Sequence, residues 1–222
     1  PFGIVQLSPD TDTIPHNVDG AYQKRTYEYC AGYQYHDKTI VGFSHTHFSG
    51  TGHSDLGDIL VMPTTGPLKL NPGTSDNPDA GYRSRFSHET EKAVPGYYEV
   101  QLDDYKVKAQ LTATPRVGVH KYTFPKDGDG RIVLDLNHGI YNYDGKTLWA
   151  FLRVENDTLL TGYRITNGWA RTNYTYFAIS FSQPIKNYGY KDHQRILYNG
   201  WWRKFPVNNN FPEMAGRKLV SY

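Results

Sequence analysis

The stretch QLDDYKVKAQLTA (Gln101–Ala113) decides the fold class of this 222-residue chain. After a polar start, apolar and polar residues alternate strictly. One side of the alternation carries Tyr105, Val107, Ala109, Leu111 and Ala113, and the other carries Lys106, Lys108, Gln110 and Thr112. A period of two residues is that of a β-strand, whose successive side chains point to opposite faces. The stretch therefore predicts a strand with one buried and one solvent-facing side.

Similar segments, rich in β-branched and aromatic residues, recur along the whole chain. Turn residues separate them, as in Asp127–Gly130 and Asn142–Gly145. We predict strands at Thr26–Tyr35, Thr39–Phe43, Asp58–Met62, Arg83–Glu91, Gly96–Leu102, Tyr105–Thr114, Val117–Phe124, Gly130–Leu136, Thr147–Glu155, Leu159–Asn167, Thr175–Phe181 and Arg217–Ser221. No stretch with a 3.6-residue period runs ten residues without Gly, Pro or a β-branched run. The sequence therefore predicts an all-β fold, a large antiparallel β-sandwich with few or no helices, as a single domain over residues 1–222.

Composition narrows the function classes. With 24 basic and 22 acidic residues, the chain has no electrostatic footprint for nucleic acid. No apolar run is long enough to span a membrane. Cys30 is the single cysteine, which excludes an internal disulfide framework and a site with several thiolate ligands. We therefore expect partners that are recognised by shape and hydrogen bonding.

The stretch GFSHTHFSGTGHSDLGD (Gly42–Asp58) is the strongest candidate site. A His-x-His pair such as His45 and His47 can place two imidazoles on one face of a strand and on one cation. Binuclear hydrolases with a His-x-His-x-Asp-His signature need Asp and His where this chain has Ser49 and Gly50. The pattern therefore favours histidines that hydrogen-bond to the loop or to a ligand, with a metalloenzyme centred on them as an alternative.

Other patterns have structural explanations. Asp127–Gly130 lacks the further acidic ligands of a calcium loop and is interpreted as a hairpin turn. The paired carboxylates at Asp103–Asp104 are typical of solvated turns, and Cys30 is typical of a buried apolar filler. Aromatic pairs fit either a sandwich core or a surface that stacks on sugar rings; they are Tyr33 with Tyr35, Tyr97–Tyr98 and Trp201–Trp202.

Several stretches together resemble glycoside hydrolase family 92, the calcium-dependent exo-α-mannosidases. They are Gly42–Gly52 with Asp55–Asp58, the opening Pro1–Thr11, Phe86–Glu91 with Pro95–Tyr98, Leu111–Pro125, Gly168–Ala170, and Tyr176–Phe177 with Phe181–Ser182. The resemblance spans essentially the whole chain. It implies that the chain is the N-terminal β-sandwich domain, cut at both ends, of an enzyme that trims terminal α-mannose from glycans with inversion.

The resemblance also implies where the reaction takes place. In this family the catalytic carboxylates and the calcium ligands lie mainly on a C-terminal (α/α)6 barrel, so we expect no catalytic or metal-binding residue in this chain and little activity from it alone. The expected partners are a mannose-containing glycan and that barrel. Bacterial secretion, or a periplasmic or cell-surface location, is implied as well, in a role such as N-glycan degradation.

On this basis we predict that the glycine-rich loop forms one wall of the mannose pocket. The predicted substrate-binding residues are Ser44, His45, His47, Ser49, Gly50, Thr51, Gly52 and Asp55. The alternative for the histidines is that they hold the loop together without touching sugar. The alternative for the whole chain is a stand-alone carbohydrate-binding β-sandwich module with exposed aromatic residues.

Overall fold

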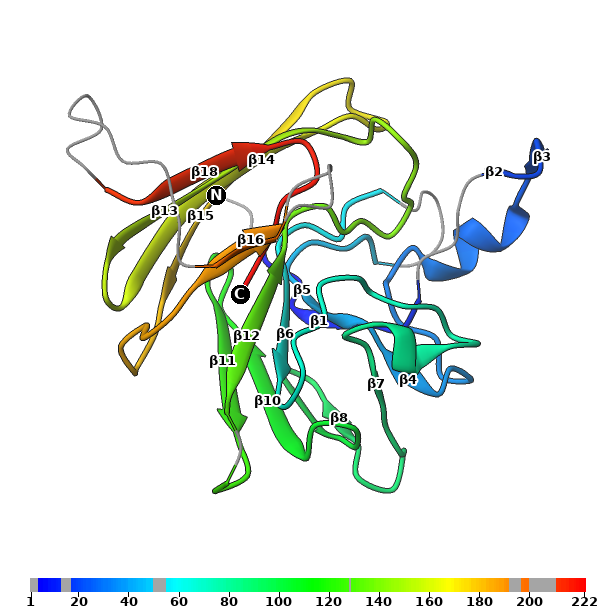
Figure 1. Cartoon of the computed structure of the whole chain (residues 1–222). Coiled ribbons are helices and arrows are strands. Elements are labelled where there is room, and N and C mark those ends of the chain that lie inside the picture. The colour runs from blue at the N-terminus through cyan, green and yellow to red at the C-terminus, as the bar shows by residue number, and fades with distance from the viewer. Residues whose placement is uncertain (1–3, 13–16, 50–54, 128, 192–196, 200–210) are drawn as a thin grey trace. The chain divides into compact units, whose positions relative to one another are not determined.

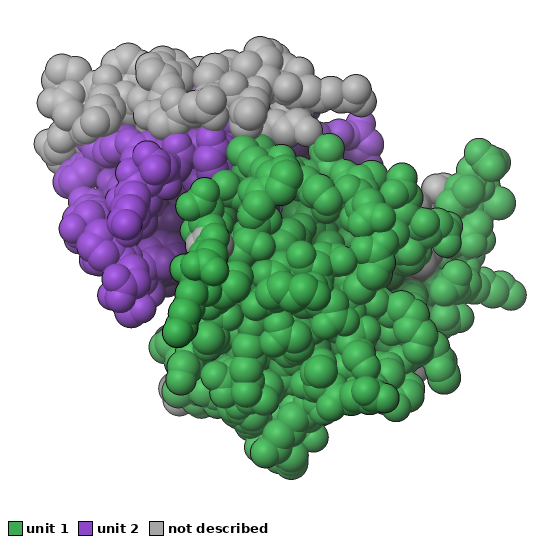
Figure 2. Space-filling view, turned by 60° about the horizontal axis from the view of Figure 1, so that its bottom comes forward, with its two compact units in different colours: residues 1–134, 138–143 green, residues 135–137, 144–222 purple. Residues whose placement is uncertain are grey.

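Strands dominate the computed structural model, which describes residues 4–12, 17–49, 55–127, 129–191, 197–199 and 211–222 (Figure 1). Contacts between Cα atoms divide the chain into two compact units. Unit 1 comprises residues 1–134 and 138–143, and unit 2 comprises residues 135–137 and 144–222. Figure 2 shows unit 1 in green and unit 2 in purple.

Unit 1 contains a four-stranded antiparallel sheet in the order β11-β10-β9-β8. Its strands are β8 (Lys92–Val94), β9 (Tyr97–Leu102), β10 (Val107–Ala113) and β11 (Gly118–Thr123). Val107, Ala109 and Leu111 are buried, whereas the residues between them are partly exposed, as the alternation predicted. Ala113 is exposed at the strand end, so the predicted buried face ends at Leu111. The residues before Val107 form a turn in which Lys106 has a φ of 54°.

A second series of strands in unit 1 carries the candidate site. It runs β1-β5-β6-β12, with β1 (Ser8–Asp10), β5 (Gly42–Ser44), β6 (Leu60–Thr64) and β12 (Arg131–Asp135), whose first four residues belong to this unit. In β1 and β5, Pro9 lies opposite Phe43. Every residue of β5 and β6 is buried. These strands form a rigid base at the point where the glycine-rich loop begins and ends.

Short elements complete unit 1, and here two predictions were wrong. The strands β2 (Asn17–Val18) and β3 (Ala21–Tyr22) form one short antiparallel pair. The strands β4 (Thr39–Ile40) and β7 (Ser84–Arg85) form another. Thr26–Tyr35 is not a strand, because Lys24–Tyr29 forms the 3₁₀-helix η1. A second 3₁₀-helix, η2, spans Pro78–Ala80. Arg83–Glu91 contributes only β7, and the following residues form turns.

Unit 2 contains a four-stranded antiparallel sheet in the order β15-β14-β13-β18. The strands are β13 (Thr147–Asn156), β14 (Leu159–Thr166), β15 (Asn173–Ser180) and β18 (Glu213–Gly216). A further run in this unit pairs β19 (Val220–Ser221) with β16 (Gly189–Lys191) and β16 with β17 (Leu197–Asn199). One face of β13 is buried through Ala150, Leu152 and Val154. The alternate residues of the same strand are more exposed.

The fold class predicted from the sequence is confirmed: the structure is all-β and antiparallel, with two short 3₁₀-helices in the described residues. The prediction of a single domain stays a prediction. Among the residues that the structure describes, no helix is long and apolar enough to cross a membrane.

Candidate functional site

A loop with a closed neck connects β5 to β6. At the neck, the backbone N–H of His45 donates to the carbonyl of Asp58 at 3.0 Å, and the N–H of Gly57 donates to the carbonyl of Thr46 at 2.8 Å. The Thr46 hydroxyl donates to Asp58 Oδ2 at 2.7 Å and accepts from the Asp58 N–H at 2.9 Å. Thr46 and Asp58 are both buried. The two ends of the loop are therefore fixed to each other.

Backbone strain is concentrated at the returning side of the neck. Leu56 and Ile59 have φ values of 76° and 57°, a region that non-glycine residues adopt at a cost. Gly57 between them has a φ of 80°, and a Cβ there would lie 2.8 Å from the backbone nitrogen of Ile140. That nitrogen donates to the carbonyl of Leu56 at 3.1 Å. Strained backbone of this kind persists only where the surroundings determine it, and it clusters at functional sites.

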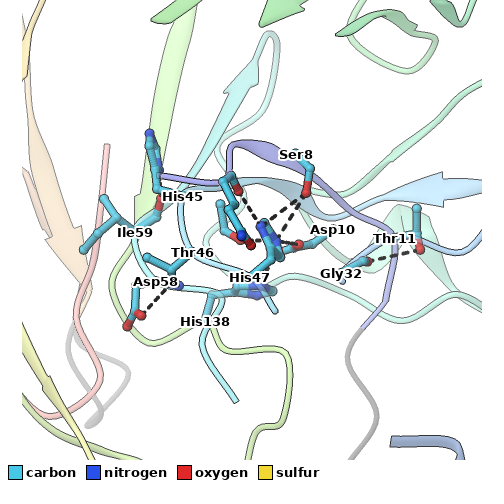
Figure 3. Close-up of polar contacts among 12 residues, drawn as sticks. Ser8, Asp10, Thr11, Gly32, His45, Thr46, His47, Asp58, Ile59 and His138 are labelled. Atoms are coloured by element: carbon cyan, nitrogen blue, oxygen red, sulfur yellow. Dashed lines mark hydrogen bonds and ion pairs between the residues drawn. The ribbon is translucent and has the colours of Figure 1, made fainter. Parts of the chain in front are cut away.

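Beneath the loop lies a fully buried carboxylate, Asp10, held between two histidines (Figure 3). Its Oδ1 lies 2.6 Å from Nε2 of His47, and its Oδ2 lies 2.7 Å from Nε2 of His138. Both histidines are buried as well. A carboxylate only accepts hydrogen bonds when it is ionised, so each of these ring nitrogens carries a proton. The three side chains join β1, the loop after β5 and the segment after β12.

The groups around His47 are acceptors that require a proton on both ring nitrogens. Its Nδ1 lies 2.6 Å from the carbonyl oxygen of Gln6, an acceptor, and its Nε2 faces the Asp10 carboxylate. A ring that donates from both nitrogens is an imidazolium. Burial acts to lower the pKa of His47, but the Asp10 charge and these hydrogen bonds outweigh it and raise the pKa above its usual value. For Asp10, burial acts to raise the pKa, and the two histidines together bring it well below its usual range.

A glycine packs directly against this ion pair. Gly32 has a φ of 80°, and a Cβ at that position would overlap Oδ1 of Asp10 and lie 2.7 Å from Nε2 of His47. The carbonyl of Gly32 also accepts a hydrogen bond from the N–H of Thr11 at 2.8 Å. Glycine at this position therefore provides both the backbone conformation and the space that the buried charges occupy.

His45 enters a second and separate network. Its Nδ1 donates to the carbonyl of Ile59 at 2.7 Å, and its Nε2 lies 3.0 Å from Nε2 of His120 on β11. Nδ1 of His120 lies 2.7 Å from the hydroxyl of Tyr122. Every contact is satisfied when both rings are neutral, with Tyr122 donating to His120, His120 to His45, and His45 to the backbone. The proton positions are assigned from these acceptors.

The pKa values of the two rings agree with this neutral chain. Burial lowers the pKa of His45, against a smaller opposing effect of its hydrogen bond to Ile59. Burial and the neighbouring His45 lower the pKa of His120 to about 3. His45 and His47 are two positions apart, yet one belongs to a neutral network and the other to an ion pair.

The predicted site residues fall into three groups. Ser44, His47 and Asp55 are buried, and the Ser44 hydroxyl lies 2.9 Å from Nε2 of His47. His45 is half-buried and Ser49 is exposed, as is the ring of Phe48 beside it. Gly50, Thr51 and Gly52 lie outside the described residues. The structure thus brings Ser44 and His47 together and places His45 in a different set of contacts.

The described part of the chain does not fit a metal ion. It contains no group of three or more His, Cys, Asp or Glu side chains with the arrangement of a metal site. The ring nitrogens of His45 and His47 have protein partners on both sides. No step of a reaction is therefore assigned to a metal held by these residues.

Three residues of the site were absent from the predicted site residues: Asp10 and His138, which are buried, and His120, which is half-buried. His120 carried a signal, because it alternates with the exposed residues Val119 and Lys121 along β11 and so faces inward. Asp10 lies within the motif Pro1–Thr11, but nothing local marks it as a partner of His47. His138 follows β12 without a recognisable pattern.

Comparison with known proteins identifies the family. The model of the glycosyl hydrolase family 92 N-terminal domain matches residues 1–218. Among solved structures, a family 92 α-mannosidase from Bacteroides thetaiotaomicron matches this chain with a TM-score of 0.82 and 37% sequence identity. The match covers 100% of this chain and 27% of the mannosidase chain. The mannosidase has been solved alone and in complex with mannoimidazole.

Two further relatives are more distant. The family 92 glycosyl hydrolase ccman5 has a TM-score of 0.65 and 22% identity over 99% of this chain and 28% of its own, which supports the fold. A protein of Arthroderma benhamiae, called an uncharacterized secreted glycosidase, is 27% identical over 134 residues, or 56% of this chain and 14% of that protein. This chain therefore spans about a quarter or less of the length of the relatives it matches. The match over residues 1–218 establishes that the chain belongs to the glycosyl hydrolase family 92 N-terminal domain family.

Proposed function

We propose that this chain is the N-terminal domain of an inverting exo-α-mannosidase that trims terminal α-mannose from glycans. The observation that supports it most is the match over the whole chain, at 37% identity, to an α-mannosidase solved with mannoimidazole. At that level of identity, local chemistry is commonly retained along with the fold. An extracytoplasmic location, whether secreted, periplasmic or at the cell surface, accords with the secreted glycosidase among the relatives.

In this proposal the loop between β5 and β6 is one wall of the mannose pocket. The residues proposed to contact sugar are Ser49, which is exposed, and Gly50, Thr51 and Gly52. Hydroxyls and accessible backbone amides are the groups that bind sugar hydroxyls, and glycine allows a close approach of the backbone. Ser44, His45, His47 and Asp55 belong to the same wall, and their role is to hold the loop in position.

Hydrolysis with inversion needs a general acid and a general base about 6.5–9.5 Å apart, with the attacking water between them. We place both groups, and the calcium ligands, on a C-terminal (α/α)6 domain of the same polypeptide. The residues of this chain bind and orient the sugar. A pocket that needs both domains leaves this chain alone with little activity.

The test compares the complete enzyme with this chain on a synthetic α-mannoside. We expect turnover by the complete enzyme only, and comparable rates for the two proteins would contradict the assignment of the catalytic groups. In the complete enzyme, Gly50→Val should sharply lower kcat/KM without changing the melting temperature. Gly216→Val on β18 is a matched control, since its Cβ would meet no atom within 4 Å and its φ lies outside the positive range that L residues rarely adopt. Unchanged kinetics in Gly50→Val would refute the wall.

A further inference from the structure

The sheet of unit 2 carries a row of aromatic rings on one face. Phe151 on β13 lies opposite Tyr163 on β14, and Tyr163 lies opposite Tyr176 on β15. The rings of Phe151 and Tyr163 are stacked, with centroids 5.3 Å apart and planes 16° apart, and those of Tyr163 and Tyr176 are 5.7 Å apart. Residues directly opposite each other in a sheet share a face, so the three rings form one continuous row.

A second row runs beside the first. Trp149 lies opposite Ile165, and Ile165 lies opposite Tyr174. We call the two rows together the aromatic face; it consists of Trp149, Phe151, Tyr163, Ile165, Tyr174 and Tyr176. Tyr176, Tyr174 and Trp149 are 71%, 56% and 41% exposed. The opposite face of the same strands, with Ala150, Leu152 and Gly162, is buried and supplies the core. The aromatic face is therefore the outer side of the sheet.

Charged and polar side chains border the aromatic rows. Arg153, two residues along β13 from Phe151, has its guanidinium 5.7 Å from the centre of the Phe151 ring and 3.0 Å from Oε2 of Glu213. The Thr161 hydroxyl, opposite Arg153, donates to Glu155. These groups are partly exposed. The pair Arg153 and Thr161 is thus the next pair on this face after Phe151 and Tyr163, and Glu213 lies opposite Arg153.

We propose that the aromatic face is an accessory glycan-binding surface, on which sugar rings of a polysaccharide stack against Tyr176 and Tyr174. One side of a pyranose ring presents C–H groups and is apolar, whereas its edge carries hydroxyls. An exposed tyrosine offers an apolar ring to the first and a hydroxyl to the second. Arg153, Glu155 and Glu213 are suited to the outer hydroxyls. The surface lies in unit 2, and the loop of the proposed pocket lies in unit 1.

Tyr176 is well placed for this role because β15 is the outermost strand in the order β15-β14-β13-β18. Its ring packs against that of Tyr163. The border suits a polyhydroxylated ligand, because the carboxylates of Glu155 and Glu213 accept hydrogen bonds and the guanidinium of Arg153 donates them, as sugar hydroxyls require. The choice of mannan as ligand rests on the proposed function, whereas the existence of the surface does not.

The test is electrophoresis of the complete enzyme in native gels that contain yeast mannan, dextran or no polysaccharide. Mannoimidazole is added at a saturating concentration to occupy the proposed pocket. We expect retardation by mannan, and its loss in Tyr176→Ala and in the double variant Tyr174→Ala/Tyr176→Ala. Tyr176→Phe keeps the ring and should keep most of the retardation. Tyr27→Ala, an exposed tyrosine of unit 1, is the matched control and should behave as the wild type.

Circular dichroism and melting curves establish that each variant is folded. Retardation of the wild type by dextran as well as mannan, lost in the same variants, supports a surface with broad glycan specificity. No retardation by either polysaccharide overturns the proposal, as does full retardation of the double variant. Self-association without polysaccharide that disappears in the double variant would make the face a contact between copies and would also overturn it.

Activity on an α-mannoside is measured in parallel on the complete enzyme. Turnover without retardation would refute the surface and leave the proposed function intact. Retardation without turnover would refute the proposed function and leave the surface intact.

Discussion

Oδ1 of Asp10 lies 2.6 Å from Nε2 of His47, and both side chains are buried. A charged pair in the interior offers little net stability over an apolar one, but removal of one partner leaves the other charge uncompensated. This relationship makes Asp10 a positioning residue for the loop of the proposed pocket, because His47 connects it to that loop.

We predict that Asp10→Asn destabilises the protein by roughly 3–5 kcal/mol, the range for breaking a buried pair. His47 would then be an imidazolium without its counter-charge. Chemical denaturation measures the effect. Asp79→Asn is the control, since Asp79 forms an exposed ion pair with Arg85 and its loss should not change the denaturation midpoint measurably. An equally small effect of Asp10→Asn would show that the pair is dispensable.

The neutral histidine chain predicts a loss of stability in acid. The pKa of His120 is lowered to about 3, so between pH 6.5 and pH 3 the unfolded state binds a proton that the folded state does not. Stability from this group is therefore present above pH 6.5 and falls as the pH drops toward 3. His45 adds to the same trend, because its pKa is also lowered.

Urea denaturation from pH 7 to pH 4 tests this slope. His120→Gln keeps a side chain that can donate to His45 but cannot be protonated, so we expect a flatter dependence on pH. His36→Gln replaces an exposed histidine and should reproduce the wild-type slope. If His120→Gln leaves the slope unchanged, His120 is not buried in its neutral form.

Gly32→Ala should be more destabilising than other replacements of glycines with positive φ. Gly32 and Gly96 have φ values of 80° and 79°, so the backbone cost of alanine is similar, about 1 kcal/mol. Only at Gly32 would the new Cβ overlap Asp10. We expect Gly96→Ala to lower stability by that backbone cost alone and Gly32→Ala by several times as much. Equal melting temperatures for the two variants would contradict the packing around Asp10.

Thr46→Val tests the neck of the loop. Valine has the shape of threonine but leaves Oδ2 and the N–H of buried Asp58 without the Thr46 hydroxyl. A typical hydrogen bond contributes about 0.5–1.5 kcal/mol, so the loss of these two costs about 1–3 kcal/mol. We expect that loss of stability, together with a raised KM for an α-mannoside in the complete enzyme. Thr112→Val removes an exposed hydrogen bond and is the control; a Thr46→Val enzyme with wild-type KM would separate the neck from substrate binding.

Period-two alternation was sufficient to predict most of the fold. It located β9, β10, β11, β13 and β14, because these strands are long and have one buried face. It missed β1, a three-residue strand that contains Pro9 and lies at one end of the sheet order, beside β5. Proline is tolerated in such an edge position, where its missing N–H does not interrupt a ladder. Thr26–Tyr35 has a strand-like composition, but the local chain folds as the 3₁₀-helix η1.

The candidate site was predictable only in part. Glycines and histidines drew attention to Gly42–Asp58. The hydrogen bonds at the neck join residues within this one stretch, so their partners are close in sequence. The partners of His47 and His45 come from other strands and could not be read from their neighbours in sequence. Pairing of Asp10 with His138 depends on the sheet order, which a single sequence with a period-two pattern does not specify.

The sequence separations within the buried ion pair have a consequence for folding. Asp10 is 37 residues from His47 and 128 residues from His138. Contacts this distant along the chain form late, because much loop-closure entropy must be lost before they are made. During synthesis, Asp10 would emerge early and remain in water until the segment after β12 appears. The base of the proposed pocket would thus be among the last parts of unit 1 to become ordered.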